Sequence, residues 1–197
     1  MKGKEGNICF EGASHAHELF LSTTKTLRSL NATIQGRIQV ISPDPRTNFA
    51  REFNVGKVQQ IIDKKCTKVV IGSGQWDAGW PENRPTLFTQ YENVLNSTIP
   101  TMLEMFQDAN VDVYYRSMHY NPLGNKISQC PPRDWRNPAV VDMYNRVTKH
   151  ECEKFNMTFL DTNDIMGIMW DRASDWCHYR DISSEMEARY FLHTIFA

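Results

Sequence analysis

Residues 68–76, Lys-Val-Val-Ile-Gly-Ser-Gly-Gln-Trp, carry the pattern that decides the fold class. Lys68–Ile71 is a compact run rich in β-branched residues, and the glycine-rich loop Gly72–Trp80 follows it directly. An apolar run without polar alternation is typical of a parallel strand that is buried on both faces of its sheet. We therefore predict a central parallel strand here, with a loop at its carboxyl end where ligands of such sheets bind.

Segments with strand and helix periodicity alternate along the whole chain. The strands are predicted at Asn7–Phe10, Ala32–Ser42, Lys68–Ile71, Val111–Tyr115 and Met157–Leu160, and the helices at His15–Leu30, Val55–Lys65, Thr86–Ala109, Pro138–Phe155 and Ser183–Phe196. Pro100 marks a candidate break in the third of these helices. This alternation predicts one α/β domain, residues 1–197, with a mainly parallel five-stranded sheet that is covered on both faces.

Composition is that of an ordinary globular protein, with 41% hydrophobic residues and a net charge of −1. The near-neutral charge gives no electrostatic case for a nucleic-acid partner. No apolar run approaches the ~18 residues of a membrane span. The N-terminus lacks the apolar segment of a signal peptide, while Asn-x-Ser/Thr sequences occur at Asn31, Asn96 and Asn156. A domain of a larger secretory-pathway protein is one interpretation.

The cysteines and histidines predict neither a metal site nor a cofactor. None of the five cysteines forms a Cys-x-x-Cys pair, which argues against zinc-ribbon and thioredoxin-like sites. Cys177 has two interpretations, a bridge to Cys130 across neighbouring loops or a buried free thiol. His15 and His17 are two residues apart and point to opposite faces of a helix, so we expect no metal between them.

Two sequence segments contain candidate catalytic residues. Asp175 precedes His178 by three positions, close enough for the carboxylate to orient the imidazole within one tight loop. Ser14 follows the apolar run Ile8–Phe10 and is the candidate nucleophile. Alternatively, Ser14 and Asp175 each cap a following helix and His178 is a surface residue. Because the carboxyl ends of parallel strands share one edge, we expect Ser14 and His178 to meet there.

Three ordered blocks resemble the SGNH/GDSL hydrolase superfamily. They are Gly12-Ala13-Ser14 after the first strand, Gly74-Gln75-Trp76 after the third, and Asp175–His178 before the last helix. The Gly-x-Ser-His and Tyr-Tyr-Arg-Ser sequences at 12–15 and 114–117 are most similar to the PC-esterase-like branch of polysaccharide and sialate O-acetyltransferases and acyl-esterases. The resemblance implies a three-layer α/β/α sandwich with a flavodoxin-like sheet, and a triad of Ser14, His178 and Asp175.

The resemblance also implies donors for the oxyanion of a tetrahedral intermediate. These would be the backbone of Ser14, Gly56 in the second block, and Gly74 or Gln75 in the third. Two positions depart from the superfamily pattern. Ala13 stands where the superfamily has aspartate, and Gln75 is the nearest residue to its asparagine.

The loops at the strand ends contain aromatic and polar residues that suit a carbohydrate, because sugar C–H faces stack on aromatic rings. The candidate substrate-binding residues are Trp76, Trp80, Arg116, His119, Tyr120 and Trp176. The alternatives are that the aromatic residues close the core beneath the loops and that His119 is a plain loop residue. Arg116 has two interpretations, pairing with a carboxylate to hold the loops or binding an acidic substrate.

These observations predict a serine-dependent acyl-esterase or O-acyltransferase. Its substrate would be a small-molecule or glycan acyl ester, most simply an O-acetylated carbohydrate, and the reaction would pass through an acyl-enzyme. No cofactor is expected. Because Ala13 and Gln75 depart from the superfamily pattern, the alternative is a non-catalytic glycan- or protein-binding module that keeps the fold.

Overall fold

A computed structural model describes residues 6–30, 38–41, 55–79, 86–121, 135–169, 172 and 177–197. The strands are β1 (Gly6–Gly12), β2 (Ile38–Ile41), β3 (Cys66–Gly72), β4 (Asp112–Arg116) and β5 (Thr158–Leu160), and the helices are α1 (Ser14–Leu30), α3 (Val55–Asp63), α4 (Phe88–Asp108), α5 (Pro138–Lys154), α6 (Asn163–Gly167) and α7 (Ile182–Phe196). The predicted alternation of strands and helices is confirmed.

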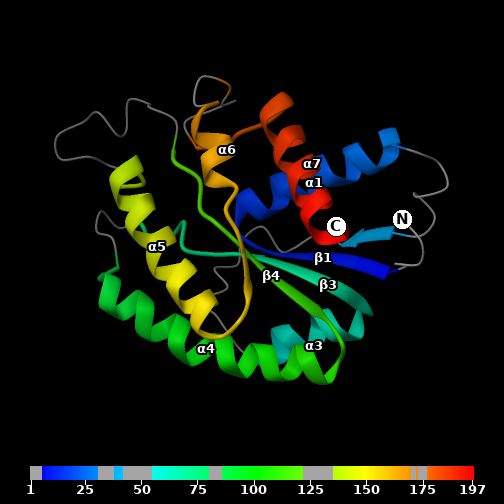
Figure 1. The fold of residues 1–197 in the computed structure, drawn as a ribbon, viewed down its shortest axis with the longest axis horizontal. Coiled ribbons are helices and arrows are strands. Elements are labelled where there is room, and N and C mark those ends of the chain that lie inside the picture. The colour runs from blue at the N-terminus through cyan, green and yellow to red at the C-terminus, as the bar shows by residue number, and fades with distance from the viewer. Residues whose placement is uncertain are drawn as a thin grey trace.

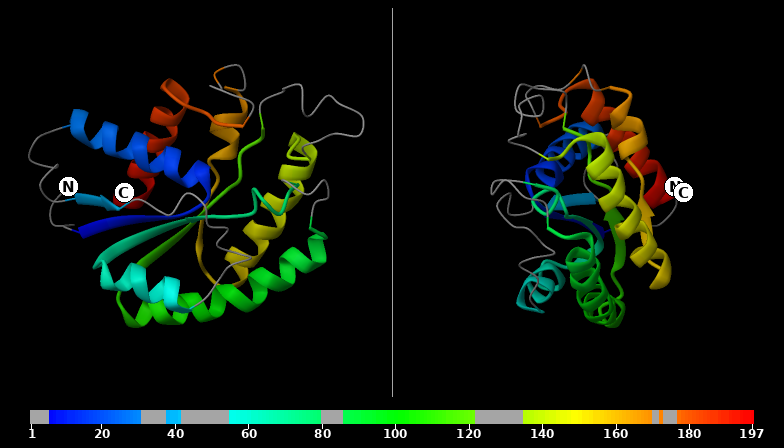
Figure 2. Two further views of the ribbon diagram at one scale, coloured as in Figure 1. Left: turned by 180° about the vertical axis from the view of Figure 1, so that it is seen from behind. Right: turned by 90° about the vertical axis from the view of Figure 1, so that its left-hand side faces the viewer.

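The five strands form one sheet in the order β2-β1-β3-β4-β5, and every neighbouring pair is parallel. This is the flavodoxin-like order. The strand β2 is added on one side of β1 and the strands β3, β4 and β5 on the other, so the switch point in strand order lies between β1 and β3. Helices α1 and α7 lie on one face, while α3, α4 and α5 lie on the other (Figure 1 and Figure 2). The predicted three-layer α/β/α sandwich is confirmed.

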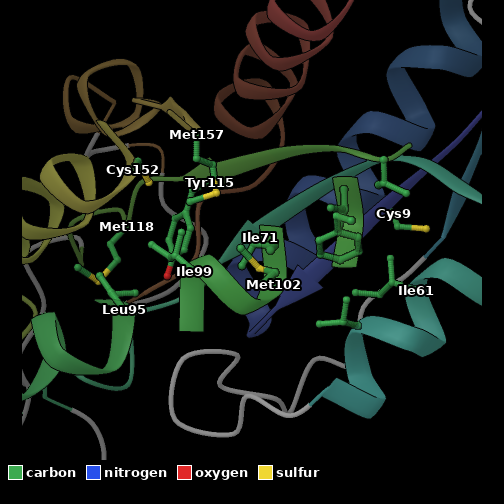
Figure 3. Close-up of a cluster of buried hydrophobic side chains, with 14 of the residues drawn as sticks. Cys9, Ile61, Ile71, Leu95, Ile99, Met102, Tyr115, Met118, Cys152 and Met157 are labelled. Atoms are coloured by element: carbon green, nitrogen blue, oxygen red, sulfur yellow. The ribbon is translucent and has the colours of Figure 1, made fainter. Parts of the chain in front are cut away.

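Strand β3 contributes to both hydrophobic cores, as its sequence predicted. Val69 and Ile71 pack with the buried residues of α3, α4 and α5, and Figure 3 shows Ile71 in this cluster beside Ile99 and Met102. Val70 points the other way and packs with the cluster of β1, α1 and α7. Alternate side chains of one strand point to opposite faces, so a run of apolar residues requires cover on both.

The helix at Pro100 differs from the sequence-based prediction, and the partner of Lys68 was not predicted. Helix α4 continues through Pro100 without ending, because Ile99 and Met102 beside it are anchored in the core. Lys68 is buried inside the apolar strand, and its ammonium lies 2.6 Å from a carboxylate oxygen of Asp112 on β4. Of the strand predicted at Ala32–Ser42, only β2 falls within the described residues.

Cys9 and Cys66 form a disulfide that joins the neighbouring strands β1 and β3, a pairing that the sequence spacing did not indicate. Cys152 is a buried free thiol on α5. The suggested bridge between Cys177 and Cys130 involves a residue outside the described part of the chain. None of the helices in the described ranges combines the length and apolar character that a membrane crossing requires.

Gly12, at the carboxyl end of β1, allows a close approach between β1 and β3. Its φ of +142° is unfavourable for other residues, and a Cβ here would collide with the carbonyl oxygen of Gly72, its register partner on β3. A Cβ on Gly72 itself would meet Ala16 and Arg116 only at 3.8 Å, an ordinary contact. The turn from β1 into α1 therefore requires glycine at position 12.

We expect Gly12→Ala to lower the free energy of unfolding by about 3 kcal/mol or more, since backbone strain and overpacking add. The matched variant Gly72→Ala should lose less than about 1 kcal/mol, since its new methyl group has room. Urea unfolding followed by circular dichroism measures both. Equal losses in the two variants would contradict the close approach described above.

Candidate active site

Ser14 is the first residue of α1, directly at the carboxyl end of β1. The carbonyl of Ala13 accepts from the backbone N–H groups of Ala16, at 2.9 Å, and His17, at 3.3 Å. Ala13 thus holds the N-cap position, and Ser14 does not serve as the cap. The backbone N–H of Ser14 belongs to the first turn, where unpaired donors and the positive end of the helix dipole favour negative charge.

His178 lies against this first turn although 163 positions separate it from His15 in the chain. The ring centroids of His15 and His178 are 5.4 Å apart. Two residues later, the guanidinium of Arg180 pairs with Glu18 of α1 at 3.2 Å. The segment before α7 is therefore held against the first turns of α1 through His15 and Glu18. Asp175, like Trp80 and Trp176, lies outside the described residues.

A buried ion pair lies behind His178. Arg116, the last residue of β4, donates from Nε to a carboxylate oxygen of Glu187 on α7 at 2.6 Å. The Nε2 atom of His119 lies 3.0 Å from the same oxygen and 3.0 Å from the hydroxyl of Thr162. Arg116, His119 and Glu187 are each at most 3% exposed. The Arg116 guanidinium is thus directed into the protein and holds β4 to α7.

The electrostatics of this cluster follow from its burial. Burial by itself would raise the pKa of Glu187, but Arg116 and His119 hold that pKa well below its ordinary value. Burial lowers the pKa of His119, and the charge of Arg116 lowers it further. Burial likewise lowers the pKa of His15 well below its ordinary value. The structure therefore favours an ionic pair of Arg116 and Glu187.

The predicted oxyanion donors lie in different environments. Gln75 is buried, and its amide nitrogen donates to the carbonyl of His119 at 3.1 Å. Gly74 has a φ of +95° and packs closely against Met118 and Tyr91, which leaves no room for a side chain. Gly56 is exposed in the first turn of α3, on the face of the sheet opposite α1.

Several hollows open among the described residues of this region, and two of them are lined by predicted site residues. The smaller is lined by His15, Glu18, Arg116, His119, His178, Tyr179 and Glu187. The larger, of about 260 Å³, lies beside α5 and β5 and includes Tyr120, Asp142 and Asp161. The hydroxyl of Tyr120 donates to Asp142 at 2.7 Å, and burial together with this hydrogen bond raises the pKa of Tyr120 to about 12. Tyr120 and His178 therefore line different hollows, and Trp76 is half-buried in the turn after β3.

Sequence reasoning missed Glu187. Glu187 lies at four-residue intervals from Ser183, Phe191 and Ile195, which form one buried face of α7. This spacing is the sequence signal that could have revealed it. A carboxylate on the buried stripe of a helix requires a partner, and Arg116 provides it.

Comparisons with known proteins support the fold. No family model and no curated protein matches the chain. Among solved structures it is similar to the acetylxylan esterase Axe2 from Geobacillus stearothermophilus, with a TM-score of 0.70, 20% identity, and coverage of 99% of this chain and 96% of that one. The acetyl xylan esterase AlAXEase has a TM-score of 0.69 and 12% identity, with coverage of 96% and 99%. The chain therefore shares the three-layer α/β/α fold of these two esterase structures.

Structures of catalytic mutants of Axe2 have also been solved, and each match covers 99% of this chain and 96% of the Axe2 chain. They replace a serine, an aspartate and a histidine of Axe2 with alanine, and that aspartate precedes that histidine by three positions.

Proposed function

We propose that this protein is a serine-dependent esterase that removes O-acyl groups, most simply acetyl, from a carbohydrate. Ser14 is the nucleophile, His178 the general base and Asp175 the group that orients the imidazole. The observation that carries the proposal is the contact between the rings of His15 and His178, because it brings His178 to the turn that begins with Ser14.

The reaction proceeds in two halves. The Ser14 hydroxyl attacks the acyl carbonyl while His178 takes its proton, and the tetrahedral intermediate then collapses to an acyl-enzyme. As the bond to the sugar oxygen breaks, His178 gives this proton to that oxygen, and the sugar leaves with a free hydroxyl. Water then attacks the acyl-enzyme while His178 takes its proton. His178 returns that proton to the Ser14 oxygen as the acyl bond breaks and the free acid leaves. If a second sugar hydroxyl replaces water, the same residues perform O-acyl transfer, as the PC-esterase-like sequences at 12–15 and 114–117 suggest.

The oxyanion needs donors, and the backbone N–H of Ser14 at the start of α1 is the first of them in this proposal. The backbone N–H of Gly74 is a better second candidate than the side chain of Gln75, because the Gln75 amide already donates to His119. Gly56 remains a proposed third donor.

The choice of a carbohydrate ester has two supports. Solved structures of the same fold include two acetylxylan esterases, and the three-residue spacing of the catalytic aspartate and histidine of Axe2 recurs at Asp175 and His178. Trp76, Trp80 and Trp176 are proposed aromatic surfaces for the sugar. Arg116 acts in this proposal by holding β4 to α7, since its guanidinium is buried against Glu187.

A fluorophosphonate probe tests the proposed nucleophile directly. We expect it to label wild-type protein at Ser14 and to block acetate release from acetylated xylooligosaccharides and p-nitrophenyl acetate. Ser14→Ala should lose both labelling and turnover. Ser29→Ala, which removes an exposed serine from the same helix, should keep both. A protein that is never labelled and never turns over an acyl ester would instead be the non-catalytic binding module.

A further inference from the structure

Three metal-ligating side chains converge beside the proposed active site. One ring nitrogen of His15, the sulfur of Cys177 and one ring nitrogen of His178 all lie within 4.8 Å of one another. The Cys177 sulfur is 3.1 Å from Nδ1 of His178. His15 and Cys177 are buried and His178 is half-buried, so the group lies below the surface but within reach of solvent.

His15 adds a second, independent observation. Its side chain is only 5% exposed, and its Nε2 atom has no hydrogen-bond partner among the described residues. A buried polar atom without a partner costs about 1–3 kcal/mol, so such atoms are uncommon unless a ligand satisfies them. A bound cation beside His15 would supply the missing partner.

The donor set selects the kind of cation. Two imidazole nitrogens and a thiolate suit Zn²⁺ and other thiophilic metals, whereas Mg²⁺ and Ca²⁺ take oxygen ligands. Zinc–nitrogen and zinc–sulfur bonds of about 2.0–2.3 Å in a tetrahedron place ligand atoms roughly 3.4–3.6 Å apart. The Cys177 sulfur lies 3.1 Å from Nδ1 and 3.6 Å from Nε2 of His178, close to this spacing, and His15 lies within 4.8 Å of both side chains. Small side-chain rotations would complete the tetrahedron. Glu18, which lines the same hollow, or water can take the fourth position.

We propose that His15, Cys177 and His178 bind a thiophilic divalent cation, Zn²⁺ being the best match. The spacing of His15 and His17 predicted no metal site between those two residues. That prediction covered only neighbours along the helix and not residues that the fold brings close to His15. The other two ligands, Cys177 and His178, come from the segment before α7. Because His178 would give its lone pair to the metal, binding would also stop acyl-ester hydrolysis. The expected inhibition rests on the proposed function, whereas the metal site does not.

Cobalt and zinc titrations of the purified wild-type protein test the site without any enzyme assay. We expect Co²⁺ to bind with a thiolate charge-transfer absorption that Zn²⁺ abolishes, while Mg²⁺ leaves it unchanged. Cys177→Ser and His15→Asn should each weaken Zn²⁺ binding by at least about 100-fold, because loss of an outer-shell partner alone costs 10–100-fold. His17→Asn is the matched control on the same helix and should bind as the wild type does.

X-ray absorption of the zinc-loaded wild-type protein keeps the test independent of variant folding. One sulfur and two imidazole nitrogens around the zinc are expected. A shell of nitrogen and oxygen alone, or wild-type affinity in both Cys177→Ser and His15→Asn, would overturn the site.

The inhibition arm separates the two proposals. Zn²⁺ should block turnover and fluorophosphonate labelling of the wild type, a chelator should restore both, and His15→Asn should stay active in zinc. Metal binding in a protein without esterase activity would overturn the proposed function and leave the site standing. If the protein is an active esterase that Zn²⁺ does not inhibit and that does not bind Zn²⁺, the site would be overturned.

Discussion

Replacing His178 with alanine should lower kcat for acetyl-ester hydrolysis by about 10⁴- to 10⁶-fold, the loss seen when a triad base is removed from a serine hydrolase. The reason is that a serine hydroxyl is a poor nucleophile unless a neighbouring base takes its proton. Initial rates with p-nitrophenyl acetate measure the effect. His193→Ala is the matched control, because His193 is an exposed histidine on α7. Both variants should unfold at temperatures close to that of the wild type.

A double variant sharpens this prediction. Ser14→Ala combined with His178→Ala should be no slower than either single variant, because residues that act as one catalytic unit lose their effect together. The residual rate would then come from substrate binding and the oxyanion donors. If the two losses multiplied instead, Ser14 and His178 would act in separate steps, and the proposed proton transfer between them would be wrong.

The fold could be predicted because the sequence pattern is local. Apolar runs such as Val69–Ile71 fix the strands, and a parallel sheet then determines which loop ends share an edge. Pro100 shows the limit of local reasoning. Proline usually interrupts a helix, but the buried side chains of Ile99 and Met102, on either side of Pro100, hold α4 against its core. Lys68 shows the same limit, since its partner Asp112 comes from another strand.

The candidate site was less predictable because its polar contacts join distant segments. Ser14 and His178 follow from their positions at strand ends and before the last helix. The pair Arg116 and Glu187 does not, since 71 residues separate them and a glutamate within a helix usually faces solvent. The direction of the Gln75 amide was equally hidden, because a side-chain hydrogen bond to the carbonyl of His119 leaves no pattern in the sequence.

Removing the charge of Glu187 should have the largest effect on stability among single polar substitutions in this cluster. Glu187→Gln leaves the buried guanidinium of Arg116 without its counter-charge, and breaking such a pair costs about 3–5 kcal/mol. Glu185→Gln on the same helix removes a surface pair with Arg189 and should cost far less, because solvent screens an exposed pair. Urea unfolding at neutral pH measures the difference between the two variants, and equal losses would contradict the buried pair.

The same pair predicts how stability depends on pH. The folded pKa of Glu187 lies below its unfolded value of about 4.3, so its contribution is complete above that pH and declines as the pH falls through lower values. Glu187→Gln should lack this component of acid destabilisation while the other carboxyl groups still titrate. Replacing both partners, as Arg116→Met with Glu187→Leu, should recover most of the stability at neutral pH, because two apolar side chains need no counter-charge. Failure of the double variant to recover would mean that the contact with His119 and Thr162, rather than the charge pair, holds β4 to α7.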